Sequence, residues 1–465
     1  MKRLVLLVSL IIFLAIPTAK AQLSEQDSLA LVALYDATNG ADWDNNEGWL
    51  VEPACSWDGV VCNDQGIVTQ LDLASRNLVG TIPAELGNIT SLIELKLGSN
   101  QLSGSLPPEL GQLTSLELLS LSNNQFTGSI PPELGQLSNL GALFLNFNQL
   151  SGPIPAELGQ LSKLGWFDAA FSQLTGPIPS TFGQLDNLQF LHLARNQLTG
   201  PLPAELGDMQ TLMSLWLNDN LIDGPIPSEL SQAPWLASLW LFGNELSGSI
   251  PPELSQAPSL GTLWLYDNQL TGPIPPELGE APRLSALNVS KNQLSGSVPG
   301  ELGNLTELVQ LILNDNLQLT GILPEALTAL TNLTRFNFQN TGLCENTSSS
   351  FQAWLNSIET LESSGCQGVS VEEASERPAQ LTLSPNYPNP VRSATHFRYG
   401  LPQPERVVLE LFDVQGRKVA TIDEGAKQAG WHETTFHVGD LPPGVYVYRL
   451  QVQDAAISSQ MVLVQ

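Results

Sequence analysis

The chain has 465 residues and a formal net charge of −28 at pH 7, with 46 acidic against 18 basic residues. A surface this acidic repels the phosphate backbone of nucleic acids and the head groups of anionic membranes. We therefore expect neither nucleic acid nor an anionic membrane surface as a partner.

Residues 1–21 have the three parts of a secretory signal peptide. Lys2 and Arg3 form a basic start, an apolar run extends from Leu4 to Ile16, and Ala19-Lys-Ala21 supplies a small-residue cleavage site. Cleavage would remove three bases and no acids, which takes the formal charge from −28 to −31. No other stretch reaches the roughly 18 apolar residues of a membrane span. We expect an exported chain without a membrane span.

Residues 22–70 combine one helical segment with a cluster of tryptophans and cysteines. The apolar residues Leu29, Leu31, Val32, Leu34 and Tyr35 have the spacing of one helix face. They are followed by Trp43, Trp49 and the run Cys55-Ser-Trp57-Asp-Gly59-Val-Val-Cys62. Two tryptophans and a short cross-link suit a lid over the open end of a repeat array.

From Leu71 to about Thr341 the sequence matches itself every 24 residues. One unit reads Leu212-Met-Ser-Leu215-Trp-Leu217-Asn-Asp-Asn220-Leu-Ile-Asp-Gly224-Pro-Ile226-Pro227-Ser-Glu-Leu230. The alternating pair Leu215 and Leu217 predicts a short strand with both leucines turned inward. One unit cannot cover these leucines alone, so stacked neighbours bury them, at roughly 1.5–3 kcal/mol per large aliphatic side chain. A fixed period of this length predicts a solenoid.

Three polar or special positions recur with the same period. Asn220 can bond backbone groups of the turn, and Gly224 permits a positive φ at the bend. An acidic residue after the proline can complement the first turn of a short convex helix. These acids are Glu85, Glu109, Glu133, Glu157, Glu205, Glu229, Glu253, Glu277 and Glu301. The alternative is a row of calcium ions bound by these acids. One carboxylate per unit supplies too few ligands for a cation that takes six to eight oxygens, so we expect no metal site.

The pattern L-x-x-L-x-L-x-x-N-x-L-x-G-x-I-P-x-x-L-G resembles the plant-specific class of leucine-rich repeats, in eleven or twelve copies. The resemblance implies an α/β solenoid, a horseshoe or superhelix with a parallel concave sheet and short helical or extended convex segments. Residues 22–70, with the C-x-W-x-G-V-x-C signature, are similar to the amino-terminal cap of that family. Residues 342–366 look like the closing cap, with Phe351, Trp354, Leu355, Ile358 and Leu361 at helical spacing.

One unit departs from the pattern at residues 167–172. It has Ala169 where the other units have leucine and Ser172 where they have asparagine. Phe167 beside Ala169 roughly conserves volume, which cores tolerate. Neutral drift and a local bend that serves a site both remain open.

The four cysteines lie two in each predicted cap, in a chain that we expect to be exported. This favours disulfides over metal binding. Of the three possible connectivities, two would tie together opposite ends of a long solenoid, so we expect Cys55–Cys62 and Cys344–Cys366.

The chain changes character after the repeats. Residues 367–380 are polar and acidic and predict a linker. Residues 381–465 consist of short alternating runs separated by turn residues, which predicts a small all-β sandwich. Its motifs are Tyr387-Pro-Asn-Pro390, Leu411-Phe-Asp413-Val-Gln-Gly416-Arg417-Lys-Val419 and Leu441-Pro-Pro-Gly444-Val-Tyr446-Val-Tyr-Arg449-Leu450. They resemble the sorting domain of type IX secretion cargo in Gram-negative bacteria, which implies contact with the secretion machinery and then removal of the domain or attachment to the cell surface.

A ligand would meet the side chains that alternate with the strand leucines, because these face the concave side. Adjacent strands lie about 4.8 Å apart, so Trp216, Trp240 and Trp264 are predicted to form a contiguous aromatic ladder. The first three units and the last two are largely free of aromatic residues there. The full candidate site is Phe144, Asn146, Phe147, Trp166, Asp168, His192, Arg195, Trp216, Asn218, Asp219, Trp240, Phe242, Trp264, Tyr266 and Asp267.

Exposed aromatic rings with polar groups between them suit a sugar face or the anchor residues of a peptide or protein. We therefore predict a secreted or outer-surface recognition protein for an extracellular protein, peptide or polysaccharide. One alternative is that the rings stack on one another and only stiffen the sheet, as in a structural spacer or adhesin. Another is a plant apoplastic protein that resembles polygalacturonase inhibitors or receptor ectodomains, against which the tail argues.

An enzyme is not expected, and neither is a cofactor. Three of the four histidines, His396, His432 and His437, lie in the tail. The sequence has no nucleophile elbow, phosphate loop or metal-ligand spacing. Asp219 and Asp267 are two units apart, about 10 Å by strand spacing, whereas paired glycosidase carboxylates need roughly 5–9.5 Å.

Overall fold

The computed structural model describes residues 25–364, 380–386, 389–391, 394–439, 441–453 and 455–464. The predicted signal peptide (1–21), Cys366 and most of the predicted linker (367–379) lie outside the described residues. The chain divides into two compact units between Cys366 and Gln367. Each unit is described by itself.

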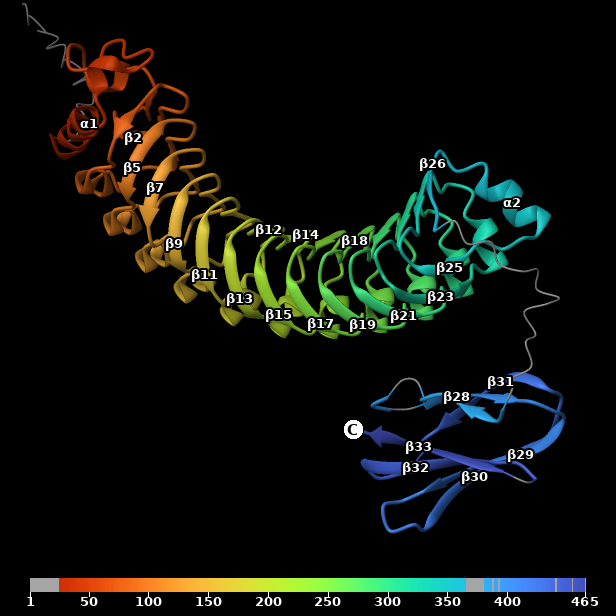
Figure 1. Cartoon of the computed structure of the whole chain (residues 1–465). Helices are drawn as coiled ribbons and strands as arrows, with labels where there is room; N and C mark the ends of the chain where they lie inside the picture. The colour runs from red at the N-terminus through yellow and green to blue at the C-terminus, as the bar shows by residue number, and fades with distance from the viewer. Residues whose placement is uncertain are drawn as a thin grey trace, which may run out of the picture. The chain divides into compact units, whose positions relative to one another are not determined.

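The first unit is a curved solenoid whose inner side is one 14-stranded sheet (Figure 1). β1 (Val60–Cys62) pairs antiparallel with β2 (Val68–Asp72), and all later neighbours pair in parallel. The inward-facing strand leucines are buried, as Leu215 and Leu217 show, except that Leu361 in the last strand is half-buried. The later strands are β4 (Glu94–Lys96), β6 (Leu118–Ser120), β8 (Ala142–Phe144), β10 (Trp166–Asp168), β12 (Phe190–His192), β14 (Ser214–Trp216), β16 (Ser238–Trp240), β18 (Thr262–Trp264), β20 (Ala286–Asn288), β22 (Gln310–Ile312), β24 (Arg335–Asn337) and β26 (Thr360–Glu362).

A second parallel sheet follows the bend after each asparagine, where the sequence pattern allowed an extended segment. Most of its glycines have positive φ, such as 76° at Gly224, which lies against Pro201 of the preceding unit. The strands are β3 (Val79–Gly80), β5 (Gln101–Ser105), β7 (Gln125–Gly128), β9 (Gln149–Pro153), β11 (Gln173–Gly176), β13 (Gln197–Pro201), β15 (Leu221–Gly224), β17 (Glu245–Gly248), β19 (Gln269–Gly272), β21 (Gln293–Gly296), β23 (Gln318–Ile322) and β25 (Gly342–Cys344).

Short 3-10 helices close each rung on the convex side, and a proline stands at the cap of each. The periodic glutamates lie in their first turns, as Glu229 does in η9, where a negative charge is favoured. The helices are η3 (Ala84–Asn88), η4 (Pro108–Gln112), η5 (Pro132–Gln136), η6 (Ala156–Gln160), η7 (Ser180–Gln184), η8 (Ala204–Asp208), η9 (Ser228–Gln232), η10 (Pro252–Gln256), η11 (Pro276–Glu280), η12 (Gly300–Asn304) and η13 (Glu325–Ala329). The predicted fold class, a leucine-rich-repeat solenoid with a parallel concave sheet, is confirmed.

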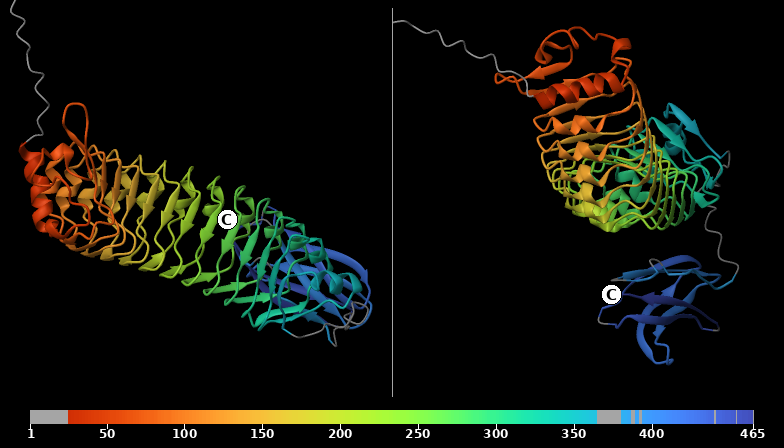
Figure 2. Two further views of the ribbon diagram at one scale, coloured as in Figure 1. Left: turned by 90° about the horizontal axis from the view of Figure 1, so that it is seen from above. Right: turned by 90° about the vertical axis from the view of Figure 1, so that its left-hand side faces the viewer.

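The two ends of the solenoid are covered by helices. α1 (Glu25–Ala37) lies across the first rung, and Figure 2 shows it at the end of the coil. Its buried residues are Asp27, Ala30, Leu31 and Leu34. Leu29, which the spacing placed on the buried side, is 62% exposed, because it falls one step outside the buried arc. At the other end α2 (Ser349–Leu355) buries Phe351 and Leu355, and its N-cap Ser348 accepts from the Phe351 N–H.

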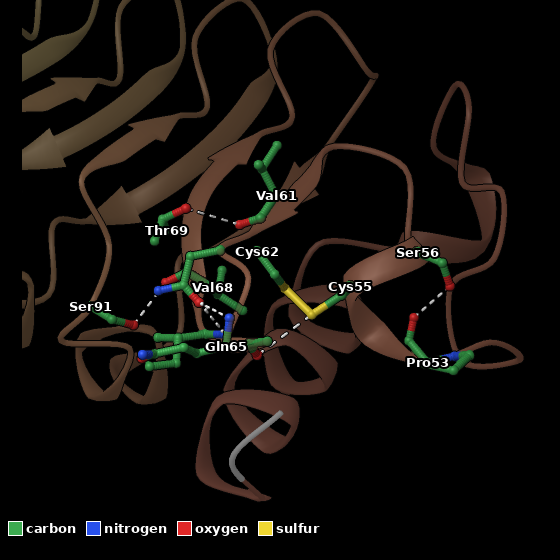
Figure 3. The surroundings of a disulfide bond; sticks show 12 residues. Pro53, Cys55, Ser56, Val61, Cys62, Gln65, Val68, Thr69 and Ser91 are labelled. Atoms are coloured by element: carbon green, nitrogen blue, oxygen red, sulfur yellow. Dashed lines mark hydrogen bonds between the residues drawn. A yellow bond between two sulfur atoms is a disulfide. The ribbon is translucent and has the colours of Figure 1, made fainter. Parts of the chain in front are cut away.

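The amino-terminal disulfide joins Cys55 in η2 (Ala54–Ser56) to Cys62 at the end of β1, as predicted. Figure 3 shows this disulfide beside the backbone of Val61 and Val68. The Thr69 hydroxyl donates a hydrogen bond to the Val61 carbonyl, and the Ser91 hydroxyl donates one to the Val68 carbonyl. Nearby, Trp49 packs between Tyr35 and Trp57. Trp49 follows the short helix η1 (Gly40–Asp42) in the chain. Cys344 is also disulfide-bonded; its predicted partner, Cys366, lies outside the described residues.

The irregular unit at residues 167–172 keeps its volume with aromatic rings. Phe167 and Ala169 are both fully buried, and the Phe167 ring meets Phe182 edge-on at 6.0 Å. Phe182 stands in η7 where the neighbouring units have leucine. Ser172 does not replace the asparagine of the other units, because its buried Oγ has no hydrogen-bond partner.

The second unit is an antiparallel all-β structure, and this part of the predicted fold class is also confirmed. One sheet has the order β27 (Thr382–Leu383), β28 (Ala394–Leu401), β31 (Gly430–His437); the other has the order β30 (Lys418–Lys427), β29 (Glu405–Phe412), β32 (Gly444–Gln451), β33 (Ala456–Leu463). Apolar side chains of both sheets form one core, among them Phe397, Tyr399, Leu409 and Tyr448.

Candidate binding surface on the concave sheet

Four rows of side chains run along the concave sheet, because residues one unit apart lie side by side. The strand register pairs Asp168 with His192, His192 with Trp216, Trp216 with Trp240 and Trp240 with Trp264. We name the rows after their place in each unit. The first row includes Trp166, Phe190, Ser214, Ser238 and Thr262; the central row Phe144, Asp168, His192, Trp216, Trp240, Trp264 and Asn288; the third row Asn146, Ala170, Ala194, Asn218, Phe242 and Tyr266; the outer row Phe147, Phe171, Arg195, Asp219, Gly243 and Asp267.

The central row forms a continuous stack of aromatic rings on β12, β14, β16 and β18, along the inner curve in Figure 1. The ring centroids of His192 and Trp216 are 4.0 Å apart, with 6° between their planes. Trp216 and Trp240 follow at 4.2 Å and 4°, and Trp240 and Trp264 at 4.6 Å and 15°. The three indoles are half-buried, whereas the leucines between them are fully buried. The ladder lies on the concave side, where the sequence pattern put it.

The stack determines how these rings can meet a ligand. The sequence left two arrangements open, ring faces exposed to a sugar and rings stacked on one another. Within the stack each interior ring covers the face of its neighbour, because parallel rungs about 4.8 Å apart bring flat rings into contact. The interior rings therefore present their edges to the concave side. One indole face of Trp264 has no aromatic ring stacked on it, since the next residue in the central row is Asn288.

Shorter aromatic stacks flank the central row and widen it into a band. In the first row Trp166, which is 37% exposed, stacks on Phe190 at 4.3 Å. In the third row Phe242 stacks on Tyr266 at 4.3 Å. The outer-row pair Phe147 and Phe171 stacks at 4.2 Å. Together with Phe144, 5.5 Å from Trp166, these rings form what we call the aromatic band.

Charged groups border the band in the outer row. Arg195 lies over the Phe171 ring at 5.0 Å, and its Nε is 3.4 Å from the Asp219 carboxylate. Asn218 Nδ2 donates to Asp219 Oδ2 at 2.8 Å. The phenol of Tyr266 has its pKa raised by burial and by the carboxylates of Asp219 and Asp267. The predicted polar residues of this part of the site are thus brought together, while Asn146 lies apart from them, three rungs from Asn218 in the third row.

Buried His192 and half-buried Asp168 form a polar part of the band. His192 is 7% exposed, and its Nε2 lies 3.1 Å from Ser214 Oγ. Burial lowers its pKa to about 4, because the charged ring cannot be hydrated there. Burial also raises the pKa of Asp168, whose Oδ1 accepts the Ala170 N–H. At neutral pH the histidine is therefore uncharged.

Two polar atoms at the middle of the band have no partner. Trp216 Nε1 donates to Ser238 Oγ at 3.4 Å, but the equivalent Nε1 of Trp240 is buried and unpaired. Asn218 Oδ1 is also buried and unpaired, and the Asn218 side chain is only 6% exposed. Each unpaired buried group costs about 1–3 kcal/mol. These atoms are the clearest sign in the band of groups that a ligand could satisfy.

Sequence reasoning missed three contributors. Ser214 and Ser238 bond the ring nitrogens of the preceding rung, and the recurring Ser-Leu-Trp triplet was the available signal. Gly243 is the third: it leaves the outer row without a side chain next to Asp219. Its signal was a glycine at a position that carries a side chain in every neighbouring unit.

Within the described residues, no three His, Cys, Asp or Glu side chains gather as a metal site would require. Those same residues contain no helix whose length and apolar character would let it cross a membrane.

Two family models match the chain. The Leucine Rich Repeat model matches residues 91–113, 115–137, 187–209, 235–257, 259–281 and 283–305. The Secretion system C-terminal sorting domain matches residues 386–465. The chain therefore contains leucine-rich repeats and a C-terminal secretion sorting domain. Such a tail implies use of the secretion machinery and a place outside the cell or on its surface.

Solved structures with the same fold include plant receptors. The ectodomain of the receptor kinase GASSHO1/SCHENGEN3 from Arabidopsis thaliana, in complex with CASPARIAN STRIP INTEGRITY FACTOR 2, is 33% identical at a TM-score of 0.57, over 72% of this chain and 47% of that one. The plant peptide hormone receptor RGFR1 in complex with RGF2 is 35% identical at a TM-score of 0.58, over 66% of this chain and 52% of that one. The chain thus spans about half the length of these receptors. A plant ice-binding protein shares the fold alone. It is 24% identical at a TM-score of 0.50, over 75% of this chain and 99% of that one.

Proposed function

We propose that the chain is an exported recognition protein that binds an extracellular peptide or protein through the aromatic band. The observation that carries this proposal is the confinement of the band to the middle rungs, with Trp240 Nε1 and Asn218 Oδ1 unpaired at its centre. A chain that served only as a spacer would gain nothing from unpaired buried groups, because each lowers its stability. The two receptor structures support a recognition role, since both were solved as complexes.

A peptide fits the band better than a glycan does. Sugars pack on open ring faces, but the faces of Trp216 and Trp240 are covered by neighbouring rings. A peptide offers apolar side chains for ring edges, and its main chain offers both a donor for Asn218 Oδ1 and an acceptor for Trp240 Nε1. Central, desolvated aromatic residues are also the usual anchors of protein interfaces.

We further propose that the band has no catalytic role. His192 and Ser214 stand at 3.1 Å, as a base and a nucleophile would. Both side chains are buried, and the Trp216 ring covers the face of the imidazole. A substrate carbonyl therefore has no approach to the Ser214 hydroxyl. The bond instead fixes the ring that begins the stack.

The test is binding of the labelled chain to an array that carries both extracellular peptides and glycans. The variant is the triple substitution Trp216→Ala, Trp240→Ala, Trp264→Ala, and the control is Trp235→Ala, which removes a 60% exposed tryptophan between η9 and β16. We expect peptides to bind, the control to keep its affinity, and the triple variant to lose at least about 30-fold, the equivalent of one strong anchor residue.

Three results would contradict the proposal. If the triple variant bound the same peptides as well as the unmodified chain does, the band would not be the site. If only glycans bound, and did so through the tryptophans, the ligand class would be wrong. If the chain bound nothing while the triple variant lost only stability, the structural spacer would be the better account. Circular dichroism of each variant shows whether the solenoid is still folded.

A further inference from the structure

The outer row has a gap at Gly243. From Phe147 to Asp267 the residues of this row have positive φ, between 55° for Phe147 and 65° for Gly243, and all of these except Gly243 carry a side chain. A Cβ on Gly243 would come within 2.7 Å of Asp219 Oδ1. The carboxylate of Asp219 thus borders the empty position on one side, and Asp267 follows on the other, two rungs or about 10 Å from Asp219.

The negative charge around this gap is only partly compensated. Asp219 is balanced by Arg195 and by the Asn218 amide. Asp267 makes no ion pair or side-chain hydrogen bond with any described residue, and Lys291, its successor in the outer row, is exposed and does not pair with it. Among the groups within reach, only Arg195 opposes the effect of both carboxylates on Tyr266. A further positive charge would therefore be attracted to the unpaired carboxylate of Asp267.

The floor beside the gap holds a group that lacks a donor. Asn218 precedes Asp219 and shares the concave side with Trp216, since it is two residues further along the alternation. Its Nδ2 is engaged by Asp219, whereas its Oδ1 is buried without a partner. Arginine and lysine carry N–H donors and no acceptor, so a basic group satisfies this oxygen and the carboxylates together.

Aromatic faces complete the surroundings. The third-row stack ends at Tyr266, because the next rung has Ser290, and the central stack ends at Trp264, because the next rung has Asn288. Each therefore keeps one ring face that no aromatic neighbour covers. Cations are attracted to the faces of tryptophan and tyrosine, and the aliphatic stem of a basic side chain packs on them.

We propose that Asn218, Asp219, Tyr266 and Asp267, around the gap at Gly243, bind a lysine or arginine side chain of the peptide ligand. This inference rests on the proposed function and specifies the ligand as basic. A metal ion suits the gap less well, because its ligands must all lie within roughly 2.6 Å of it, and the two carboxylates start from rungs about 10 Å apart. A guanidinium group spans more, with donors on both edges.

The test selects a random peptide display library on the full chain and measures the affinity of the enriched peptides by fluorescence polarisation. Asp267→Asn removes the unpaired charge without changing its shape. Gly243→Asn fills the gap with the residue that the same row carries at Asn123, where φ is 54°. The matched control is Asp315→Asn, a carboxylate of the same row beyond the band, which bonds Asn314 and Asn340.

We expect the enriched peptides to contain lysine or arginine, and both Asp267→Asn and Gly243→Asn to weaken their binding about tenfold while Asp315→Asn does not. Replacing the basic residue of a peptide by glutamine should weaken its binding to the unmodified chain. The same replacement should have little further effect on the affinity of the peptide for the Asp267→Asn variant. Added salt should reduce the difference, because it screens exposed charges.

The outcomes separate this inference from the proposed function. Peptides that depend on Trp216, Trp240 and Trp264 but are neutral, or that bind Asp267→Asn with full affinity, overturn the basic-residue proposal and leave the recognition function standing. If no selected peptide depends on the three tryptophans, both proposals fail. A Gly243→Asn variant that retains the circular dichroism of the unmodified chain and also its peptide affinity would show that the gap is not occupied by the ligand.

Discussion

Replacing Asn220 with alanine is expected to lower the free energy of unfolding of the solenoid by about 3–4 kcal/mol, through lost hydrogen bonds and one orphaned N–H. Asn220 Nδ2 donates to the carbonyl oxygens of Leu193 and Leu217, both at 3.0 Å, and Oδ1 accepts the Leu198 N–H at 3.0 Å. Each carbonyl keeps a second amide donor, from Asn196 and Asn244 respectively. The Leu198 N–H would be left without its side-chain acceptor inside the stack.

Urea denaturation followed by tryptophan fluorescence measures this loss, and hydrogen exchange locates it. Because each repeat contacts only its neighbours, protection should fall first in the rungs around Leu193 and Leu217. Asn187→Ala is the control, since this exposed asparagine makes one bond, to the Ser162 carbonyl at 2.7 Å, and should cost less than about 1 kcal/mol. Equal midpoints for Asn220→Ala and the unmodified chain would refute the structural role of the asparagine row.

Ser172→Asn is the counterpart of opposite sign. Ser172 holds the asparagine position in the irregular unit, and its Oγ is buried and unpaired. Its backbone N–H donates to the Arg195 carbonyl at 3.3 Å, and the Asn148 N–H donates to the Phe171 carbonyl at 3.2 Å. The backbone of the two rungs therefore has the same geometry at this position. An asparagine should therefore restore the row and raise the free energy of unfolding by about 1 kcal/mol. A lower free energy of unfolding instead would mean that this unit does not accommodate the longer asparagine side chain.

The sequence was sufficient for the solenoid because the repeat converts long-range contacts into a period. Once Leu215 and Leu217 are placed in a strand, their neighbours 24 residues away are placed as well, and the tryptophan row follows from the same step. The order of strands in the second unit has no such period. β28 pairs with β31 and β29 with β32 across dozens of residues, so alternating runs could predict its strands but not their pairing.

The candidate surface was predictable in position but not in geometry. Alternation placed Trp216 on the concave side, yet it could not tell whether rings meet a ligand by face or by edge, because that depends on side-chain rotamers across the rungs. The packing of Phe167 against Phe182 depends likewise on residues in different segments of one rung. Unpaired atoms such as Trp240 Nε1 appear only once the neighbouring hydroxyl groups have been placed.

The His192→Phe variant should remove a pH dependence of stability between about pH 6.5 and pH 4. In the folded chain burial lowers the pKa of His192 to about 4 from 6.5. Between these values the unfolded chain binds a proton that the folded chain does not, so the free energy of unfolding falls as the pH falls. The total contribution is about 3 kcal/mol, since each pKa unit corresponds to about 1.4 kcal/mol. It is fully present above pH 6.5 and lost near pH 4.

Phenylalanine is the suitable replacement because it can still stack on Trp216, 4.0 Å away, and loses only the bond to Ser214. Urea midpoints of both proteins from pH 3.5 to pH 8 give the measurement, and their difference isolates His192 because all carboxylates and the tail histidines are common to both. The neighbouring ionisable group is Asp168, paired with His192 in the sheet register. Asp168→Asn in both backgrounds tests its share. Parallel curves for the two proteins between pH 4 and pH 6.5 would show that the imidazole is not buried in its neutral form.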